Sequence, residues 1–159
     1  MFPRLRYLLV LPALIWGCGE TERASEVDRA KPGYSQFVLY CSPCHGKTGR
    51  GAPRIFPPLV GESWVNLDPE IPISIVLKGL EGRLTMEGQE YMNQMAPLEN
   101  RMTDAKIAET LTFVRSSFGN TSSAVTPEQV AAVRKQIKDR KQKWTVEEMQ
   151  ERIALAEQE

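Results

Sequence analysis

The pentapeptide Cys41-Ser42-Pro43-Cys44-His45 constrains this chain more than any other part of its sequence. Its C-x-x-C-H pattern is the one through which a c-type haem is attached by two thioether bonds. Two thiols three positions apart on one helical turn can both reach the vinyl groups of a porphyrin, and the next residue then lies beneath the iron as an axial ligand. We therefore predict that Cys41 and Cys44 hold a haem and that His45 binds its iron.

Two other uses of a C-x-x-C pair stay open at this point. A dithiol redox site needs the motif beside a strand-helix-strand unit, and the flanking sequence does not show alternating buried strands. A zinc site needs four ligands, and the chain offers only Cys18, Cys41, Cys44 and His45 as thiols and imidazole. Cys18 has another expected use, at the end of the export signal. Haem attachment is therefore the favoured interpretation of the motif.

Residues 1–17 have the pattern of an export signal. Two arginines in residues 1–6 precede an apolar run over residues 7–16, which is too short to span a bilayer comfortably. The run ends in Gly17-Cys18 and is similar to a bacterial lipobox, in which a small residue precedes a cysteine that becomes lipidated. We expect Cys18 to carry two or three acyl chains, which hold a protein on a membrane more firmly than one. An ordinary signal peptide, cleaved nearby, is the alternative.

The rest of the chain has room for one small domain with extensions. Residues 19–31 are polar and predict a flexible tether, residues 32–120 predict the domain, and residues 121–159 predict a helical C-terminal extension. The chain carries 20 basic and 20 acidic residues, so no strong positive field is present. We therefore expect no nucleic-acid partner.

Hydrophobic periodicity predicts a mostly helical domain. Helices are expected over residues 33–41 and 70–80, and from the N-cap Thr103 to about residue 118. Two extended pieces at residues 84–86 and 89–91 predict a small β-hairpin. Phe113 of the last helix is expected to meet the first helix near Gly33 and Phe37. The fold class is thus all-α, with a small hairpin and a helical C-terminal extension.

The segment after the motif is expected to orient the histidine. Pro57 follows His45 by twelve residues, and a proline fixes the backbone so that its carbonyl can be aimed reproducibly. A metal-bound imidazole normally donates its second N–H to such an acceptor. A rigid surface loop is the alternative reading of Pro57. The glycine-rich residues 46–51 predict a tight turn rather than a phosphate-binding loop, because such a loop follows a buried strand and ends in Gly-Lys-Ser/Thr, whereas here Gly-Lys-Thr begins the stretch.

The second axial ligand is expected to be one of the four methionines in the C-terminal half of the predicted domain. A thioether usually only fills a core, so most of the four should be structural. Met95 is favoured because Pro97 stiffens the loop that follows it, and Met92 is the next candidate. The four are Met86, Met92, Met95 and Met102.

Taken together, these features resemble a class I monohaem cytochrome c over roughly residues 33–120. The resemblance is carried by C-x-x-C-H, Pro57-Pro58-Leu59, Met95 with its nearby proline, and a closing helix that runs into Gly119-Asn120. It implies thioethers at Cys41 and Cys44, axial ligands at His45 and Met95, an orienting carbonyl at Pro57, and contact of Trp64 with a haem propionate. Met-Ala-Pro at residues 95–97 departs from the commoner Met-Pro.

The same resemblance implies a location and a role. Bacterial members acquire their haem outside the cytoplasm, which agrees with an exported, lipid-anchored periplasmic protein. With both axial positions filled, the iron can only gain and lose an electron, so we expect an electron carrier rather than an enzyme. Its expected partners are redox proteins such as a dehydrogenase or a terminal oxidase, met at a haem edge near Lys47, Arg50 and Arg54. A haem-based sensor or peroxidase-like enzyme with a labile sixth ligand is the alternative, and a structural anchor in a respiratory complex is a third.

The C-terminal extension is expected to form two helices, one beginning at Thr126-Pro127 and one from Thr145 to about residue 157. Between them, residues 134–143 contain six basic side chains and one acidic one. A solvated helix face is the plainer interpretation of this stretch. Docking of an acidic partner or of anionic headgroups is the other.

Overall fold

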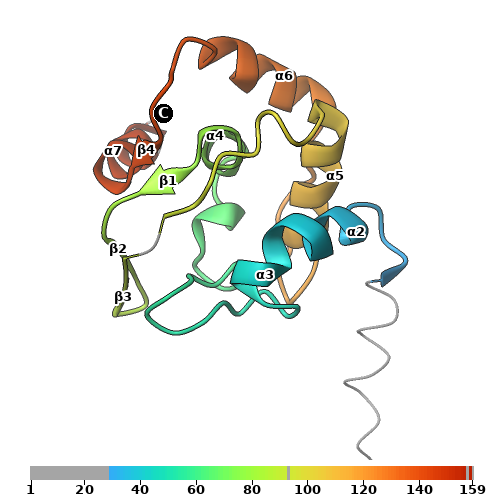
Figure 1. Ribbon diagram of the computed structural model, residues 1–159, viewed down its shortest axis with the longest axis horizontal. Helices are drawn as coiled ribbons and strands as arrows, with labels where there is room; N and C mark the ends of the chain where they lie inside the picture. The colour runs from blue at the N-terminus through green and yellow to red at the C-terminus, as the bar shows by residue number, and fades with distance from the viewer. Residues whose placement is uncertain (1–28, 93, 157, 159) are drawn as a thin grey trace, which may run out of the picture.

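Helices supply most of the regular structure, with a few short strands. The computed structural model describes residues 29–92, 94–156 and 158 (Figure 1), so the predicted signal, Cys18 and the tether up to residue 28 lie outside it. Within this part of the chain, no helix combines the length and apolar character needed to cross a membrane. The elements in chain order are α2 (Tyr34–Gln36), η1 (Phe37–Cys41), α3 (Ser42–His45), η2 (Trp64–Asn66), α4 (Glu70–Lys78), β1 (Leu80–Glu81), β2 (Leu84–Met86), β3 (Gln89–Tyr91), α5 (Asp104–Arg115), α6 (Pro127–Gln136), β4 (Trp144–Thr145) and α7 (Val146–Ala156).

α2, η1 and α3 follow one another without a break and form the first helical segment, Tyr34–His45. This segment crosses α5 in direct backbone contact. Gly33 has φ +87°, and a Cβ placed on it would lie 2.1 Å from the carbonyl oxygen of Glu109. One turn later, the fully buried ring of Phe37 lies 5.3 Å from that of Phe113, centroid to centroid. This is the contact expected from the sequence. It fixes the start of the segment against the back of α5.

The first helical segment is longer than the sequence predicts. The expected helix over residues 33–41 continues through α3 to His45, so the motif itself is helical. Pro43 does not end it, because Pro43 lies in the first turn of α3, where a missing N–H costs no hydrogen bond. The stretch Phe37–Cys41 is π-helical, a form that often marks functional sites.

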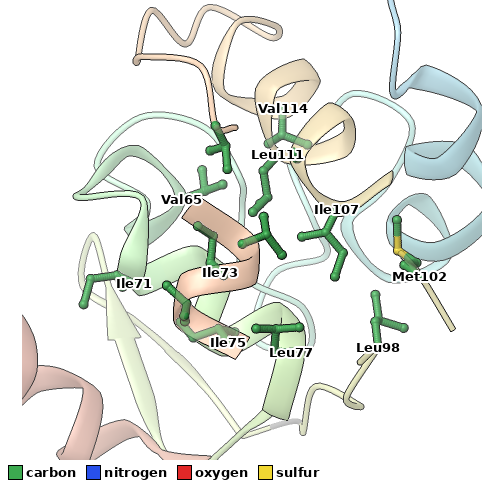
Figure 2. Packing of buried hydrophobic residues seen from close by; sticks show 14 of the residues in the cluster. Val65, Ile71, Ile73, Ile75, Leu77, Leu98, Met102, Ile107, Leu111 and Val114 are labelled. Carbon is green, nitrogen blue, oxygen red and sulfur yellow. The ribbon is translucent and has the colours of Figure 1, made fainter. Parts of the chain in front are cut away.

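The core lies between α4 and α5. α4 begins at Glu70 as predicted and ends at Lys78, two residues before the expected end. Figure 2 shows Ile73 and Leu77 of α4 facing the side chains of α5, among them Ile107 and Leu111. Ile73, Leu77 and Ile107 are fully buried. These two helices form the rigid wall behind the region that the motif faces.

The closing helix α5 is shorter than predicted. Thr103 caps it as expected, since its Oγ1 accepts from the backbone N–H of Lys106 at 3.3 Å. The helix ends at Arg115 and not near residue 118. The hydroxyl of Ser116 donates to the carbonyl of Thr112 at 2.9 Å, and such side-chain bonds compete with helix continuation. Phe118 then adopts φ +59°, and its ring packs 5.2 Å from that of Phe37.

The predicted hairpin is present. β2 and β3 pair antiparallel, with Leu84 opposite Tyr91. Glu87 and Gly88 form the two-residue turn with φ of +48° and +73°, the left-handed pair that matches the twist of a hairpin.

Both predicted helices of the C-terminal extension are present and pack on the domain. α6 begins after a capping box between Thr126 and Gln129, and it packs against α4 and α5. The chain then returns to β1, where β4 pairs parallel with it and Leu80 lies opposite Trp144 (Figure 1). This pairing was not expected from the sequence.

Three of the six basic residues of the 134–143 stretch are structural. Arg134 forms an ion pair with Asp104 at 2.8 Å, Arg140 pairs with Glu148, and Lys143 donates to Gln94 at 2.5 Å. Lys135, Lys138 and Lys141 are exposed. A docking role for this stretch therefore stays a prediction for these three lysines only.

The crossing at Gly33 yields a stability prediction. Gly33→Ala should lower the free energy of unfolding by about 2 to 4 kcal/mol, because the new Cβ meets the Glu109 backbone and the φ is strained. Gly119→Ala is the matched control, because Gly119 has φ +92° and nothing within 4 Å of its Cβ position. Denaturant unfolding of both variants measures the difference. Equal losses would show that the crossing tolerates a side chain.

Candidate cofactor site

An apolar cavity of about 280 Å³ lies at the centre of the domain. A void of about 150 Å³ is already a large defect in a close-packed protein interior, so this space is more than loose packing. Every predicted site residue in the described part of the chain lines it: Cys41, Cys44, His45, Pro57, Trp64 and Met95. Its other walls come from α4, the hairpin, α5 and Val146 at the start of α7.

The two cysteines of the motif are free thiols in different environments. Cys44 is exposed and Cys41 is partly buried. Burial, with a smaller effect of Cys44, raises the pKa of Cys41 to about 12. A redox-active C-x-x-C pair instead lowers the pKa of its attacking thiol. Cys41 therefore lacks the lowered pKa of an attacking thiol.

His45 presents one ring nitrogen to the cavity. Its Nδ1 lies 2.8 Å from the carbonyl oxygen of Pro57, the residue whose carbonyl is expected to orient it. Because a carbonyl can only accept, Nδ1 carries the proton and Nε2 keeps a lone pair for a metal. Burial lowers the pKa of His45, and the bond to Pro57 opposes this effect. The imidazole is therefore held in its neutral, metal-binding form.

The glycine-rich turn holds Pro57 over His45. The N–H of Gly51 donates to the carbonyl of His45 at 2.8 Å, and the N–H of Leu59 donates to that of Gly49 at 2.7 Å. A Cβ on Gly51 would lie 2.2 Å from the carbonyl oxygen of Phe56, so this approach needs glycine. The turn thus fixes the distance between the two residues that share the imidazole proton.

Three of the four methionines line the cavity, namely Met86, Met95 and Met102. Met92, the second candidate ligand, is 61% exposed and does not line it. Met86 and Met102 are buried in hydrophobic clusters. Met95 is partly buried in a loop, and its backbone N–H donates to the carbonyl of Leu80 at 2.8 Å.

Two polar residues that the sequence did not single out hold the loop that carries Trp64. The buried Arg115 donates to the carbonyls of Val65 at 2.5 Å, Leu67 at 2.7 Å and Ser123 at 2.7 Å. Burial lowers the pKa of its guanidinium. Asn120 donates to the carbonyls of Leu59 and Val114. The spacing of the sequence could have indicated that Arg115 is buried. Arg115 follows Ile107 and Leu111 by steps of four and so lies on an apolar helix face.

The donor set fits a covalent haem better than a zinc ion. Among the described residues 29–92, 94–156 and 158, no group of three or more His, Cys, Asp or Glu side chains could hold a metal ion. What the cavity offers instead is a pair of thiols at its rim, one imidazole nitrogen and a thioether within apolar walls. This combination matches a porphyrin, which supplies the four in-plane ligands of its own iron.

Comparison with known proteins also points to a haem protein. A sequence model of the cytochrome c family matches residues 30–118, more than half of the chain. Cytochrome c-552 of Thermus thermophilus is 26% identical over 125 residues, covering 65% of this chain and 95% of that protein.

Two dehydrogenase subunits are also similar to this chain. The gluconate 2-dehydrogenase cytochrome c subunit of Pantoea cypripedii is 32% identical over 115 residues and 68% of this chain. The fructose dehydrogenase cytochrome subunit of Gluconobacter japonicus is 30% identical over 114 residues and 69% of it. This chain covers only 25% and 23% of the length of these two subunits.

The hydrogen bonds that Arg115 donates to three backbone carbonyls yield a second stability prediction. Arg115→Met should lower the free energy of unfolding by about 2 to 4 kcal/mol, because it leaves buried carbonyls without a donor. Arg115→Lys should recover only part of the lost free energy, because an ammonium lacks the planar set of N–H donors of a guanidinium. Chemical denaturation, with exposed Arg101→Met as the control, measures these changes. An Arg115→Met variant as stable as the control would show that these hydrogen bonds do not stabilise the fold.

Proposed function

Because the chain belongs to the cytochrome c family and carries a covalently bound haem c, we propose that it is a one-electron carrier with His45 and Met95 as the axial ligands of the iron. The observation that carries the proposal is the bond between His45 Nδ1 and the Pro57 carbonyl, which leaves Nε2 free in the cavity that Met95 also lines. When bound, the haem supplies a reversible one-electron iron couple.

Each site residue has a separate role in this proposal. Cys41 and Cys44 anchor the group permanently, so a collision with a partner cannot release it. His45 is held in one tautomer by Pro57 and binds through Nε2. The thioether of Met95 favours the reduced state, and the apolar walls raise the potential further.

The same arrangement favours electron transfer over catalysis. Family membership and the similarity to dehydrogenase cytochrome subunits support transfer through haem. If the imidazole and the thioether occupy both axial positions, oxygen, peroxide or substrate has no position on the iron. The backbone bonds between Met95 and Leu80 support a stable sixth ligand, unlike the labile one that a sensor or peroxidase requires.

We further propose a redox enzyme as the partner. The relatives named as subunits of gluconate and fructose dehydrogenases support a dehydrogenase as electron donor, with a terminal oxidase as the other candidate. The exposed Lys47, Arg50 and Arg54 lie in the loop that follows His45, so an acidic surface would be attracted to this side of the cavity.

The ligand assignment yields a prediction with a matched control. Met95→Ala should lower the reduction potential by on the order of 100 mV, a fraction of the ~0.8 V range that axial ligands span. It should also let the reduced protein bind carbon monoxide quickly, whereas Met92→Ala, at an exposed methionine outside the cavity lining, should change neither property. Spectroelectrochemical titration and carbon monoxide mixing measure both. An unchanged potential in Met95→Ala would reject this ligand, and rapid carbon monoxide binding by the unaltered protein would favour the sensor or enzyme.

The proposed location yields a separate prediction. We propose that the protein is exported and held on a membrane through lipid on Cys18, because residues 1–18 combine an export signal with a lipobox-like end. Cys18→Ser should move the haem-containing protein from the membrane fraction to the soluble periplasmic fraction. Fractionation followed by haem staining measures this shift. A Cys18→Ser protein that has lost its signal peptide and still stays with the membranes would exclude the lipid as its anchor.

A further inference from the structure

We propose that the C-terminal extension is a positioning element that holds the Met95 loop against the haem site. The inference rests on the proposed role of Met95 as the sixth ligand. It concerns residues beyond position 118, where the family match ends.

The backbone of Met95 belongs to a short ladder that the extension completes. Met95 and Leu80 exchange two hydrogen bonds, from Met95 N–H to the Leu80 carbonyl at 2.8 Å and from Leu80 N–H to the Met95 carbonyl at 3.2 Å. On the opposite edge, β4 pairs with β1, with Leu80 opposite Trp144 and the Trp144 N–H donating to the Gly79 carbonyl at 3.2 Å. β1 is thus held between the Met95 loop and the extension.

Side chains of the extension also hold the loop on both sides of Met95. On the N-terminal side, Nζ of Lys143 donates to Oε1 of Gln94 at 2.5 Å. On the C-terminal side, the guanidinium of Arg134 donates to the carbonyl of Glu99 at 3.0 Å. The same guanidinium is fixed by Asp104 on α5, so it links the loop to the closing helix.

The extension is itself firmly anchored and can therefore act as a support. Trp144 is 7% exposed and lies beneath the guanidinium of Arg140, whose carbon is 3.7 Å from the ring centroid. Arg152 of α7 forms an ion pair with Glu70 of α4, and Met149 is fully buried. The contacts of α7 join the extension to the α4 side of the domain without using the Met95 loop.

The loop has little burial of its own to keep it in place. Met92 is 61% exposed, and Gln94, Ala96 and Pro97 are also exposed. The domain holds it mainly through the Leu80 pair, the bond from Leu98 N–H to the Val76 carbonyl and the pair of Lys78 with Glu99. Segments with few buried contacts open locally at low cost, so added hydrogen bonds directly reduce opening. Opening of this loop would withdraw the thioether from the iron.

The test removes the side-chain contacts without removing the extension. The variant Arg134→Met with Lys143→Met deletes both contacts in the full-length haem protein. The control, Lys135→Met with Lys141→Met, makes the same charge change at exposed positions of the same stretch. Circular dichroism and haem content establish that each protein is folded and loaded. If the double variant is not folded and loaded with haem, the single variant Lys143→Met is compared instead with the single control Lys141→Met.

Two readouts report the state of the sixth position rather than general stability. The first is the charge-transfer band of ferric methionine-ligated haem, and the second is the affinity of the ferric protein for imidazole, which competes with the thioether. Loss of the two charge-assisted contacts should increase imidazole affinity by about tenfold and weaken the band at a lower pH than in the control. Arg134→Lys with Lys143→Arg keeps both charges. It should therefore show a smaller increase in imidazole affinity than the double methionine variant.

The outcomes separate this inference from the proposed function. If the unaltered protein lacks the band, or Met95→Ala keeps it, the ligand assignment itself is wrong. If Met95→Ala loses the band but the double variant binds imidazole like its control, Met95 is the ligand and the extension does not position it. An increase confined to the double variant supports the positioning role.

Discussion

The backbone contact between Gly33 and Glu109 is the interaction on which the rest of the site depends. It brings the first helical segment so close to α5 that the rings of Phe37, Phe113 and Phe118 lock together beside it. Because Tyr34–His45 is one continuous helical segment, fixing its first turn also fixes its last turn, where the motif lies. The crossing therefore determines where the thiols and the imidazole point. The cavity is the space left between this segment, α4 and α5, and its apolar walls are a consequence of which helix faces meet there.

The loops around an apolar cavity cannot be held by packing alone, because their inner faces border the cavity and not other protein. In this domain, buried donors take over that task. Arg115 and Asn120, near the end of α5, satisfy carbonyls of the segment that carries Trp64. The glycine-rich turn does the same for Pro57 through backbone bonds. Burying a guanidinium carries a desolvation cost, which is offset here because its hydrogen bonds go to carbonyls that would otherwise be left without donors.

Local signals in the sequence were enough to predict the motif, the helix starts and the hairpin. Thr103, Thr126 and Thr145 all precede helices, and each cap is set by residues within one turn. What could not be predicted depends on distant partners. The pairing of Leu80 with Trp144 joins positions 64 residues apart, and strands of two residues carry no periodic signal. The early end of α5 combines the local Ser116 bond with Phe118 turning back toward Phe37, and this second contact is tertiary. Among the methionines, only the structure separates exposed Met92 from the three that line the cavity.

In the proposed site, with His45 and Met95 as the ligands, the two sides of the haem are held by different kinds of force, and this difference explains the distribution of contacts along the chain. On the histidine side, two covalent bonds join the cofactor to the helix that carries His45, so this ligand cannot move far from the iron. On the methionine side, the loop has no covalent link to the cofactor and little buried surface, so hydrogen bonds must limit its motion. The extension adds its contacts on this weaker side, through Arg134, Lys143 and the strand at Trp144. An electron carrier needs a site that changes little between its two oxidation states, and such a site is only as stable as its less constrained ligand.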